Sequence, residues 1–276
     1  MLFCLASGAA FGAMAVFGKL AYAEGATIGT LLAVRFLLAS GLFWLGGAAR
    51  RMPPARDVAI GLALGAGGYA LQAGCYFAAL DRIDASLLAL LVYTFPALVA
   101  VGAALLGRER LSHRRAAALV VASGGLALVV AGGIGTLDPL GAALALAAAA
   151  LYAGYILVSD GLSQRMSPLA LAALVCTGAA LALSVCAVLL GEFRPGALSA
   201  AGWGWLACLA GVSTVGAIGL FFAGLRRVGP TAASILATVE PLVTVVLAFA
   251  VFGESLGAVQ LLGGGLVLAA VLMVQS

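Results

Sequence analysis

Residues 74–111, GCYFAALDRIDASLLALLVYTFPALVAVGAALLGRERL, align without a gap with residues 219–256, GLFFAGLRRVGPTAASILATVEPLVTVVLAFAVFGESL. The paired positions include Gly74 with Gly219, Phe77 with Phe222, Arg82 with Arg227, Pro96 with Pro241 and Glu109 with Glu254. Chance matches of Ala, Leu and Gly are common in apolar chains, but paired Pro, Arg and Glu at one constant offset are not. The sequence therefore predicts an internal repeat.

The composition predicts that the chain resides in a lipid bilayer. Hydrophobic residues make up 64% of the 276 residues, charged residues make up 9%, and the net charge is +4. The mean hydropathy is +1.21. A soluble domain carries roughly 25% charged residues, so these few charges could not cover the surface of a soluble fold. The basic residues lie in short loops between apolar runs, which indicates membrane topology and not nucleic-acid binding.

Ten apolar runs are long enough to cross a membrane. They lie near residues 2–22, 27–46, 57–80, 85–106, 115–132, 139–159, 168–190, 203–225, 231–252 and 256–274. A spanning helix needs about 20 apolar residues, and the continuous runs exclude a barrel, whose strands alternate in polarity. The prediction is an all-α integral membrane protein with ten transmembrane helices.

The distribution of basic residues predicts that both termini are cytoplasmic. With the N-terminus inside, the cytoplasmic loops hold Arg50, Arg51, Arg56, Arg108, Arg110, Arg114, Arg115, Arg165, Arg226 and Arg227. The outer ends hold Lys19, Arg82 and Arg194. Because cytoplasmic loops are enriched in Lys and Arg, we expect a multi-pass protein of a bacterial-type inner (plasma) membrane.

The repeat predicts two units, residues 1–136 and 137–276, with five spans in each. An odd number of spans forces the two units to insert with opposite orientations. Inverted repeats are typical of secondary transporters, in which two similar halves exchange conformations and open a central site to either side.

The order of these motifs resembles the EamA family of the drug/metabolite transporter superfamily. The resemblance rests on Gly74–Leu111 followed by Gly124-Gly125, and on Gly219–Leu256 followed by Gly263-Gly264-Gly265, with Lys19 and Arg35 in the first two spans. One departure is Phe11, where many members carry Trp. The resemblance implies ten helices, cytoplasmic termini, a central cavity, and export of amino acids, related metabolites or drugs.

Tyrosines inside the predicted spans are candidates for lining a substrate cavity. Of the six tyrosines, five lie in the third, fourth and sixth spans: Tyr69, Tyr76, Tyr93, Tyr152 and Tyr155. The spacing of Tyr69, Gln72 and Tyr76 places them on one helix face, and Tyr152 and Tyr155 share another. Buried hydroxyl groups need partners, so these faces point either into a polar cavity or towards ordinary interhelical hydrogen bonds. Weaker candidates are Phe11 in the first span and Thr214, Phe221 and Thr238 in the second half.

Glu240 is the acidic residue nearest the middle of a predicted span, and it precedes Pro241. Acids within the membrane are candidates for functional sites. Two hypotheses remain open. In the first, Glu240 binds a substrate amino group or carries a proton; in the second, it forms a structural ion pair with Arg35 or a hydrogen bond across helices. Pro96 and Pro241 occupy equivalent places in the repeats and are predicted to kink two spans, either as gates or as static bends.

A secondary transporter is the leading prediction for function. A membrane-embedded enzyme is disfavoured because the chain has one histidine and lacks HExxH and GxSxG motifs. A sensor or a channel subunit is a further alternative. We expect no cofactor or metal, membrane lipids as surroundings, and a chain that can act as a monomer.

The sixth to tenth spans have no basic residue in their interiors, which favours a neutral or zwitterionic cargo. Export of amino acids, including aromatic ones, is the first choice, and a multidrug or other metabolite permease is the alternative.

Overall fold

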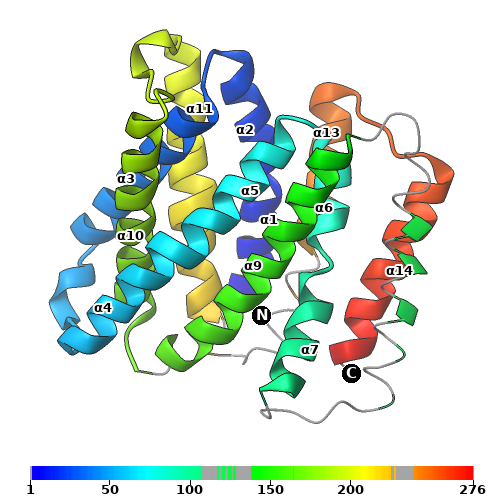
Figure 1. The fold of residues 1–276 in the computed structure, drawn as a ribbon, viewed down its shortest axis with the longest axis horizontal. Helices are drawn as coiled ribbons and strands as arrows, with labels where there is room; N and C mark the ends of the chain where they lie inside the picture. Colours follow the sequence, from blue (N-terminus) through cyan, green and yellow to red (C-terminus); the bar gives the residue numbers. More distant parts are fainter. Residues whose placement is uncertain are drawn as a thin grey trace.

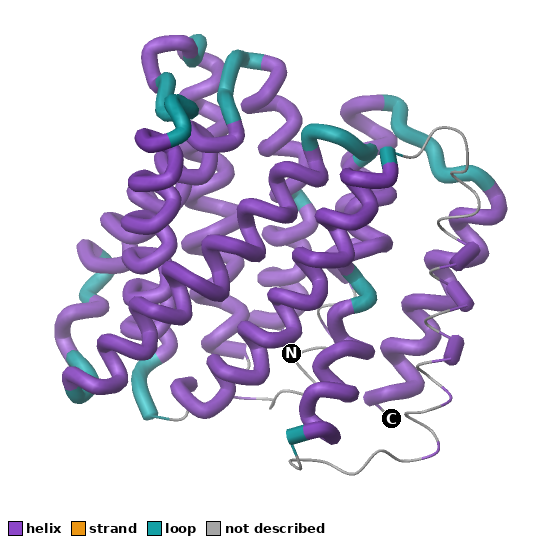
Figure 2. The backbone as a smooth tube through the Cα atoms, in the orientation of Figure 1, coloured by secondary structure: helices purple, strands orange, loops and turns teal. Residues whose placement is uncertain are grey.

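The computed structural model of the chain describes residues 2–106, 138–163, 165–224 and 239–275, and isolated positions between 113 and 128 and at 227 and 236. All regular structure in this described part is helical. Figures 1 and 2 show a bundle of tilted helices joined by short loops, with both chain ends drawn towards the lower end of the bundle.

The first half of the chain contains four described spans, three of which are interrupted. The helices are α1 (Leu2–Gly12), α2 (Met14–Ala23), α3 (Ile28–Leu45), the 3₁₀ turn η1 (Ala48–Arg51), α4 (Ala55–Ala63), the π-helical η2 (Leu64–Tyr69), α5 (Ala70–Leu80), α6 (Ala85–Val92) and α7 (Phe95–Leu105). Helices α1 and α2 together form one span, as do α4, η2 and α5.

The second half repeats this arrangement. Its elements are α9 (Pro139–Ser163), α10 (Pro168–Leu189), the 3₁₀ turn η3 (Pro195–Ala197), α11 (Ala200–Ala210), the π-helical η4 (Gly211–Gly216), α13 (Val239–Phe252) and α14 (Ala258–Gln275). Hydroxyl groups cap the first turns of several helices: Thr27 for α3, Ser167 for α10 and Ser199 for α11. Such caps satisfy backbone N–H groups that a helix leaves unpaired at its start.

Six described helices are long and apolar enough to cross a membrane. They are Leu2–Ala23, Ile28–Leu45, Ala55–Leu80, Pro139–Ser163, Pro168–Leu189 and Ala200–Gly224, and shorter apolar helices lie at Ala85–Val99, Val239–Phe252 and Ala258–Ala270. The predicted fifth span, 115–132, and the first part of the ninth fall mostly outside the described residues. The multi-pass helical architecture is therefore confirmed, and the total of ten spans stays a prediction.

The bundle exposes apolar side chains and buries polar ones. Leu42, Val246 and Phe249 are exposed, whereas Arg35 and Thr214 are buried. A soluble protein rarely exposes large contiguous apolar patches, and buried polar groups must find partners inside the bundle. This distribution is the one expected when hydrocarbon surrounds the helices.

The helix contacts between the two halves come in matching pairs. Where a helix of the first half packs on a helix of the second, the equivalent helices with the halves swapped also pack on each other. Helix α1 packs on α13, and its counterpart α9 packs on α6 and α7. Helix α2 packs on α11, and the equivalent contact is that of α9 on α5. Helix α3 packs on α11, and the equivalent contacts are those of α10 on α4 and η2. Helices α3 and α10 are equivalent to each other and pack together, so this contact is its own counterpart. Most of the interior thus lies between the halves and not within either one.

Both halves also carry an irregular turn at a similar place. The π-helical segments η2 (Leu64–Tyr69) and η4 (Gly211–Gly216) overlap when the repeats are aligned at the offset that pairs Gly74 with Gly219. In the fourth span, α6 ends at Val92 and α7 begins at Phe95. Pro96 explains this break, because proline lacks an N–H group and its ring clashes with the carbonyl four residues earlier, here Val92.

Candidate functional site: a central cavity between the halves

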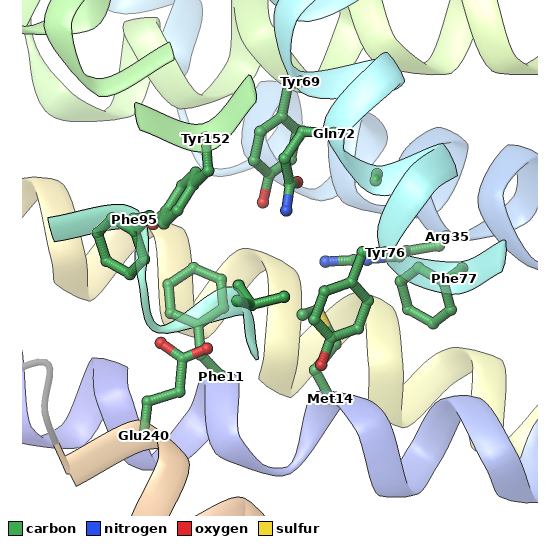
Figure 3. A pocket seen from close by; sticks show the side chains of 12 residues that line it. Phe11, Met14, Arg35, Tyr69, Gln72, Tyr76, Phe77, Phe95, Tyr152 and Glu240 are labelled. Carbon is green, nitrogen blue, oxygen red and sulfur yellow. The ribbon is translucent and has the colours of Figure 1, made fainter. Parts of the chain in front are cut away.

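A cavity lies where helices from both halves meet (Figure 3). It is lined by Phe11, Met14, Arg35, Tyr69, Gln72, Ala73, Tyr76, Phe77, Val92, Phe95, Tyr152 and Glu240. The first ten belong to the first half and the last two to the second. The cavity therefore sits at the junction that the contact pattern defines.

The cavity is small in this conformation. The space open to the centre of a water molecule is about 30 Å³, which corresponds to roughly two water molecules. A metabolite of amino-acid size does not fit without outward movement of the surrounding helices.

Glu240 reaches the cavity because α1 and α13 cross closely. A Cβ atom added at Gly12 would lie 2.8 Å from the Glu240 carbonyl oxygen, and the Thr244 hydroxyl donates a hydrogen bond of 2.9 Å to the Gly12 carbonyl. In Figure 3 the Glu240 carboxylate lies beside the Phe11 ring. Among the described residues, this carboxylate has no hydrogen bond or ion pair.

Arg35 enters the cavity wall from α3 and is 1% exposed. Its Nε donates a hydrogen bond of 2.7 Å to the Thr214 hydroxyl. The guanidinium carbon lies 4.8 Å from the ring centroid of Phe36 and 5.3 Å from that of Phe77. Its second terminal nitrogen, Nη2, is buried without a partner. The suggested ion pair between Arg35 and Glu240 is not found among the described contacts.

Aromatic rings build one wall of the cavity. Tyr69 contacts Phe36 edge-on with ring centroids 5.5 Å apart, and it contacts Tyr155 at 5.1 Å. Tyr152 stacks on Tyr155 at 6.1 Å and meets Phe95 edge-on at 4.7 Å. Edge-on and offset-stacked pairs are the favoured arrangements of aromatic rings, so this wall is a rigid and well-packed surface.

The structure brings together only part of the set predicted from the sequence. Phe11, Tyr69, Gln72, Tyr76, Tyr152 and Glu240 line the cavity, whereas Tyr93, Tyr155, Thr214 and Phe221 do not. Tyr155 lies behind Tyr69, Thr214 holds Arg35, and Phe221 packs on Phe222. Tyr93 packs against Phe95, and its buried hydroxyl has no partner. Thr238 lies outside the described residues, while Pro96 and Pro241 each adjoin a lining residue.

Arg35 and Phe95 are the lining residues of greatest chemical interest that were not among the predicted site residues. Arg35 sits inside an apolar span, which is a signal in itself, because a buried guanidinium must find an acceptor. Phe95 gives no such signal, because an aromatic residue in an apolar run is ordinary. Its place in the wall follows from the helix break at Pro96.

A polar network closes one end of the bundle, which the predicted topology assigns to the outer face. Lys19 lies 2.7 Å from a Glu254 carboxylate oxygen, and the other oxygen accepts two hydrogen bonds of 3.2 Å from the backbone and hydroxyl of Ser86. Burial raises the pKa of Glu254, but the bonds from Lys19 and Ser86 outweigh it and leave that pKa below its ordinary value. The network joins the first span, the fourth span and the loop between α13 and α14.

A bundle of apolar helices around a small cavity lined from both halves is the arrangement of a multi-pass membrane transporter. The chain belongs to the EamA-like transporter family, whose model matches residues 1–131 and 139–276, so the fold is a duplicated one and the chain is not an enzyme. It is 28% identical over 285 residues to the uncharacterized transporter YcbK of Bacillus subtilis (strain 168), covering 96% of this chain and 88% of that protein. A crystal structure at 18% identity shares the fold, with a TM-score of 0.71 over 99% of this chain and 95% of that one.

Proposed function

We propose that the chain is a secondary carrier that exports amino acids or related small zwitterionic metabolites by alternating access. The observation that carries this proposal is the small central cavity, which is walled by both halves and lined by aromatic rings, Arg35 and Glu240. Ligand sites combine apolar walls with a few placed polar groups. A static structural core would fill this space with aliphatic side chains.

The proposed mechanism needs two five-span halves, 1–136 and 137–276, that are inverted relative to each other. Support comes from the exchange symmetry of the helix contacts, in which α1 on α13 corresponds to α9 on α6 and α7. Two packings related by such an exchange have similar energies, so the bundle can open towards either face. Both termini then face the cytoplasm, as the arginine distribution indicates.

Irregular turns near the cavity give the spans places to bend. Tyr69 is the last residue of the π segment η2, and the break between α6 and α7 separates the lining residues Val92 and Phe95. Pro96 and Pro241 keep backbone hydrogen bonds open beside the cavity. We infer that the fourth and ninth spans move as gates around these prolines.

A multidrug permease is the second candidate. Glu240, together with the aromatic wall, would attract an organic cation. Arg35 opposes this reading, because its buried positive charge repels a cation from the same cavity. The amino-acid reading uses both charges and is therefore preferred.

Efflux from proteoliposomes that contain this protein alone tests the proposal. Liposomes are loaded with the twenty standard amino acids, and a parallel batch is loaded with a cationic dye. We expect at least one amino acid to leave faster than from protein-free liposomes, and we expect Glu240→Gln to reduce that rate by about tenfold or more. Release of the dye alone would favour the multidrug permease. Release of neither class would contradict the proposed transport.

A further inference from the structure

We propose that Arg35 binds the carboxylate of the cargo while Glu240, on another side of the same cavity, receives its ammonium group. The inference rests on the proposed transport function and goes beyond it, because it assigns the substrate anion to a named residue. It makes the cargo an α-amino acid and not merely a small polar solute.

The surroundings of Arg35 leave one part of its guanidinium free for a ligand. Thr214 takes the Nε hydrogen, the Tyr69 side chain also interacts with the guanidinium, and the rings of Phe36 and Phe77 flank the planar group. Nη2 remains buried without an acceptor, although Arg35 lines the cavity. A buried unsatisfied donor on a charged group is costly and calls for an explanation. A guanidinium held in one orientation in the cavity wall, with one nitrogen lacking an acceptor, matches an incoming carboxylate or phosphate.

The presence of Glu240 in the same cavity favours a carboxylate over a phosphate as the anion that Arg35 binds. Its carboxylate lines the same cavity and has no partner among the described residues. A phosphate would bring about two negative charges into a hollow that offers one cation and one further anion. An α-amino acid brings one charge of each sign and therefore satisfies both side chains. Figure 3 shows Arg35 and Glu240 approaching the cavity from different helices, with Tyr76 and Phe11 between them.

The two charges stay apart because of how they are held. Arg35 is tied to η4 through Thr214, which itself donates a hydrogen bond of 2.9 Å to the Leu209 carbonyl. Glu240 is fixed by the close crossing of α1 and α13 at Gly12. A direct ion pair would neutralise both groups and leave nothing for a ligand. Separate anchoring keeps one cation and one anion available.

A ligand series with wild-type protein tests the assignment without any substitution. Proteoliposomes are loaded with alanine, leucine, phenylalanine and threonine, with their amides, which lack the carboxylate, or with the matching acids, which lack the amine. A charge-assisted hydrogen bond contributes about tenfold to a hundredfold in affinity. We expect the amino acids that move to leave at least about tenfold faster than their amides and acids.

Substitutions at Arg35 then test whether the faster release of amino acids than of their amides depends on this residue. Arg35→Gln is expected to bring the rates of amino acid and amide together, and Arg35→Lys to restore part of the difference. The control, Arg82→Gln, removes a cation that pairs with Asp138 at the surface, 3.0 Å away, and should leave the preference unchanged. If Arg35→Gln does not fold, the wild-type ligand series alone decides.

Two results would overturn the assignment. In the first, an amide or an acid leaves as fast as its amino acid, which removes the role of Arg35 or Glu240 but leaves the transport function standing. In the second, none of the twelve compounds moves while the cationic dye does, which shows that the cargo is not a zwitterion. Failure of both the dye and the twenty amino acids would instead contradict the proposed function itself.

Discussion

Thr214 determines how the Arg35 guanidinium is held in the cavity wall. Its hydroxyl accepts the Arg35 Nε hydrogen at 2.7 Å and is fully buried. Replacing it with the isosteric valine leaves a second buried N–H group of Arg35 without a partner. We expect Thr214→Val to lower the stability by about 1–3 kcal/mol, measured as thermal unfolding in detergent.

Thr94→Val is the matched control for that prediction. Thr94 is also buried, but its hydroxyl only donates to the Leu91 carbonyl three residues earlier. Such local bonds to the helix backbone contribute little, so the loss should be clearly smaller. Equal losses in the two variants would show that Thr214 does not support Arg35.

Glu240→Gln separates function from stability at a single residue. The Glu240 carboxylate makes no hydrogen bond or ion pair within the described part of the chain, so the amide loses no stabilising contact. A charge buried without a partner is itself costly. We expect the unfolding temperature of Glu240→Gln to equal or exceed that of the wild type while transport falls. A marked drop in unfolding temperature would indicate a structural ion pair.

The residues of the cavity were only partly predictable from the sequence. Spacing along one helix places Tyr69, Gln72 and Tyr76 on a common face, and all three line the cavity. The same reasoning placed Tyr152 with Tyr155, yet only Tyr152 lines it. A helix that is apolar all round gives no signal for its rotation, so packing decides which of two neighbouring tyrosines faces inward. The hydrogen bond that joins Arg35 to Thr214 spans 179 residues, and no local pattern predicts it.

At the scale of helices, α10 and the third span approach each other through glycine. A Cβ atom at Gly65 would lie 2.1 Å from the Val175 carbonyl oxygen, and one at Gly178 would lie 2.1 Å from the Leu62 carbonyl oxygen. Small residues at helix interfaces allow such backbone contact in membranes. We expect Gly65→Ala and Gly178→Ala each to cost about 1–3 kcal/mol, measured by thermal unfolding.

Gly67→Ala provides the control within the same span. A Cβ atom there would meet nothing within 4 Å, so the protein should tolerate it. An unfolding temperature as low as that of Gly65→Ala would contradict the packing argument. Sequence alone does not tell which glycines of this glycine-rich stretch lie at the helix contact.

The network of Lys19, Glu254 and Ser86 is expected to hold one end of the helices closed across a broad pH range. Its hydrogen bonds keep the pKa of Glu254 below the ordinary value. The stabilisation is therefore complete above the ordinary carboxyl pKa and is lost only as the pH falls through the lowered one. The difference in unfolding temperature between wild type and Glu254→Gln should stay constant from about pH 7 to pH 5. A difference that already vanishes near pH 6 would show that the ion pair does not stabilise the bundle.

At the scale of the whole molecule, hydropathy predicted the helical membrane fold, and the family match supports duplication. The breaks within spans were less predictable. Pro96 gives a local reason for the end of α6 at Val92, whereas the π segments η2 and η4 arise where the halves pack on each other. The small volume of the cavity is also a property of the assembled bundle and has no signature in any single span.

Alternating access predicts that the cavity opens to one face of the membrane at a time. The most direct test places one cysteine at Ala73, a buried lining residue, after alanine replaces Cys4, Cys75, Cys176, Cys186 and Cys208. A membrane-impermeant maleimide is then added to one face or the other of oriented vesicles. Alternating access predicts labelling from each face, at rates that an exported amino acid shifts in opposite directions. Labelling from a single face, unaffected by any amino acid, would contradict it.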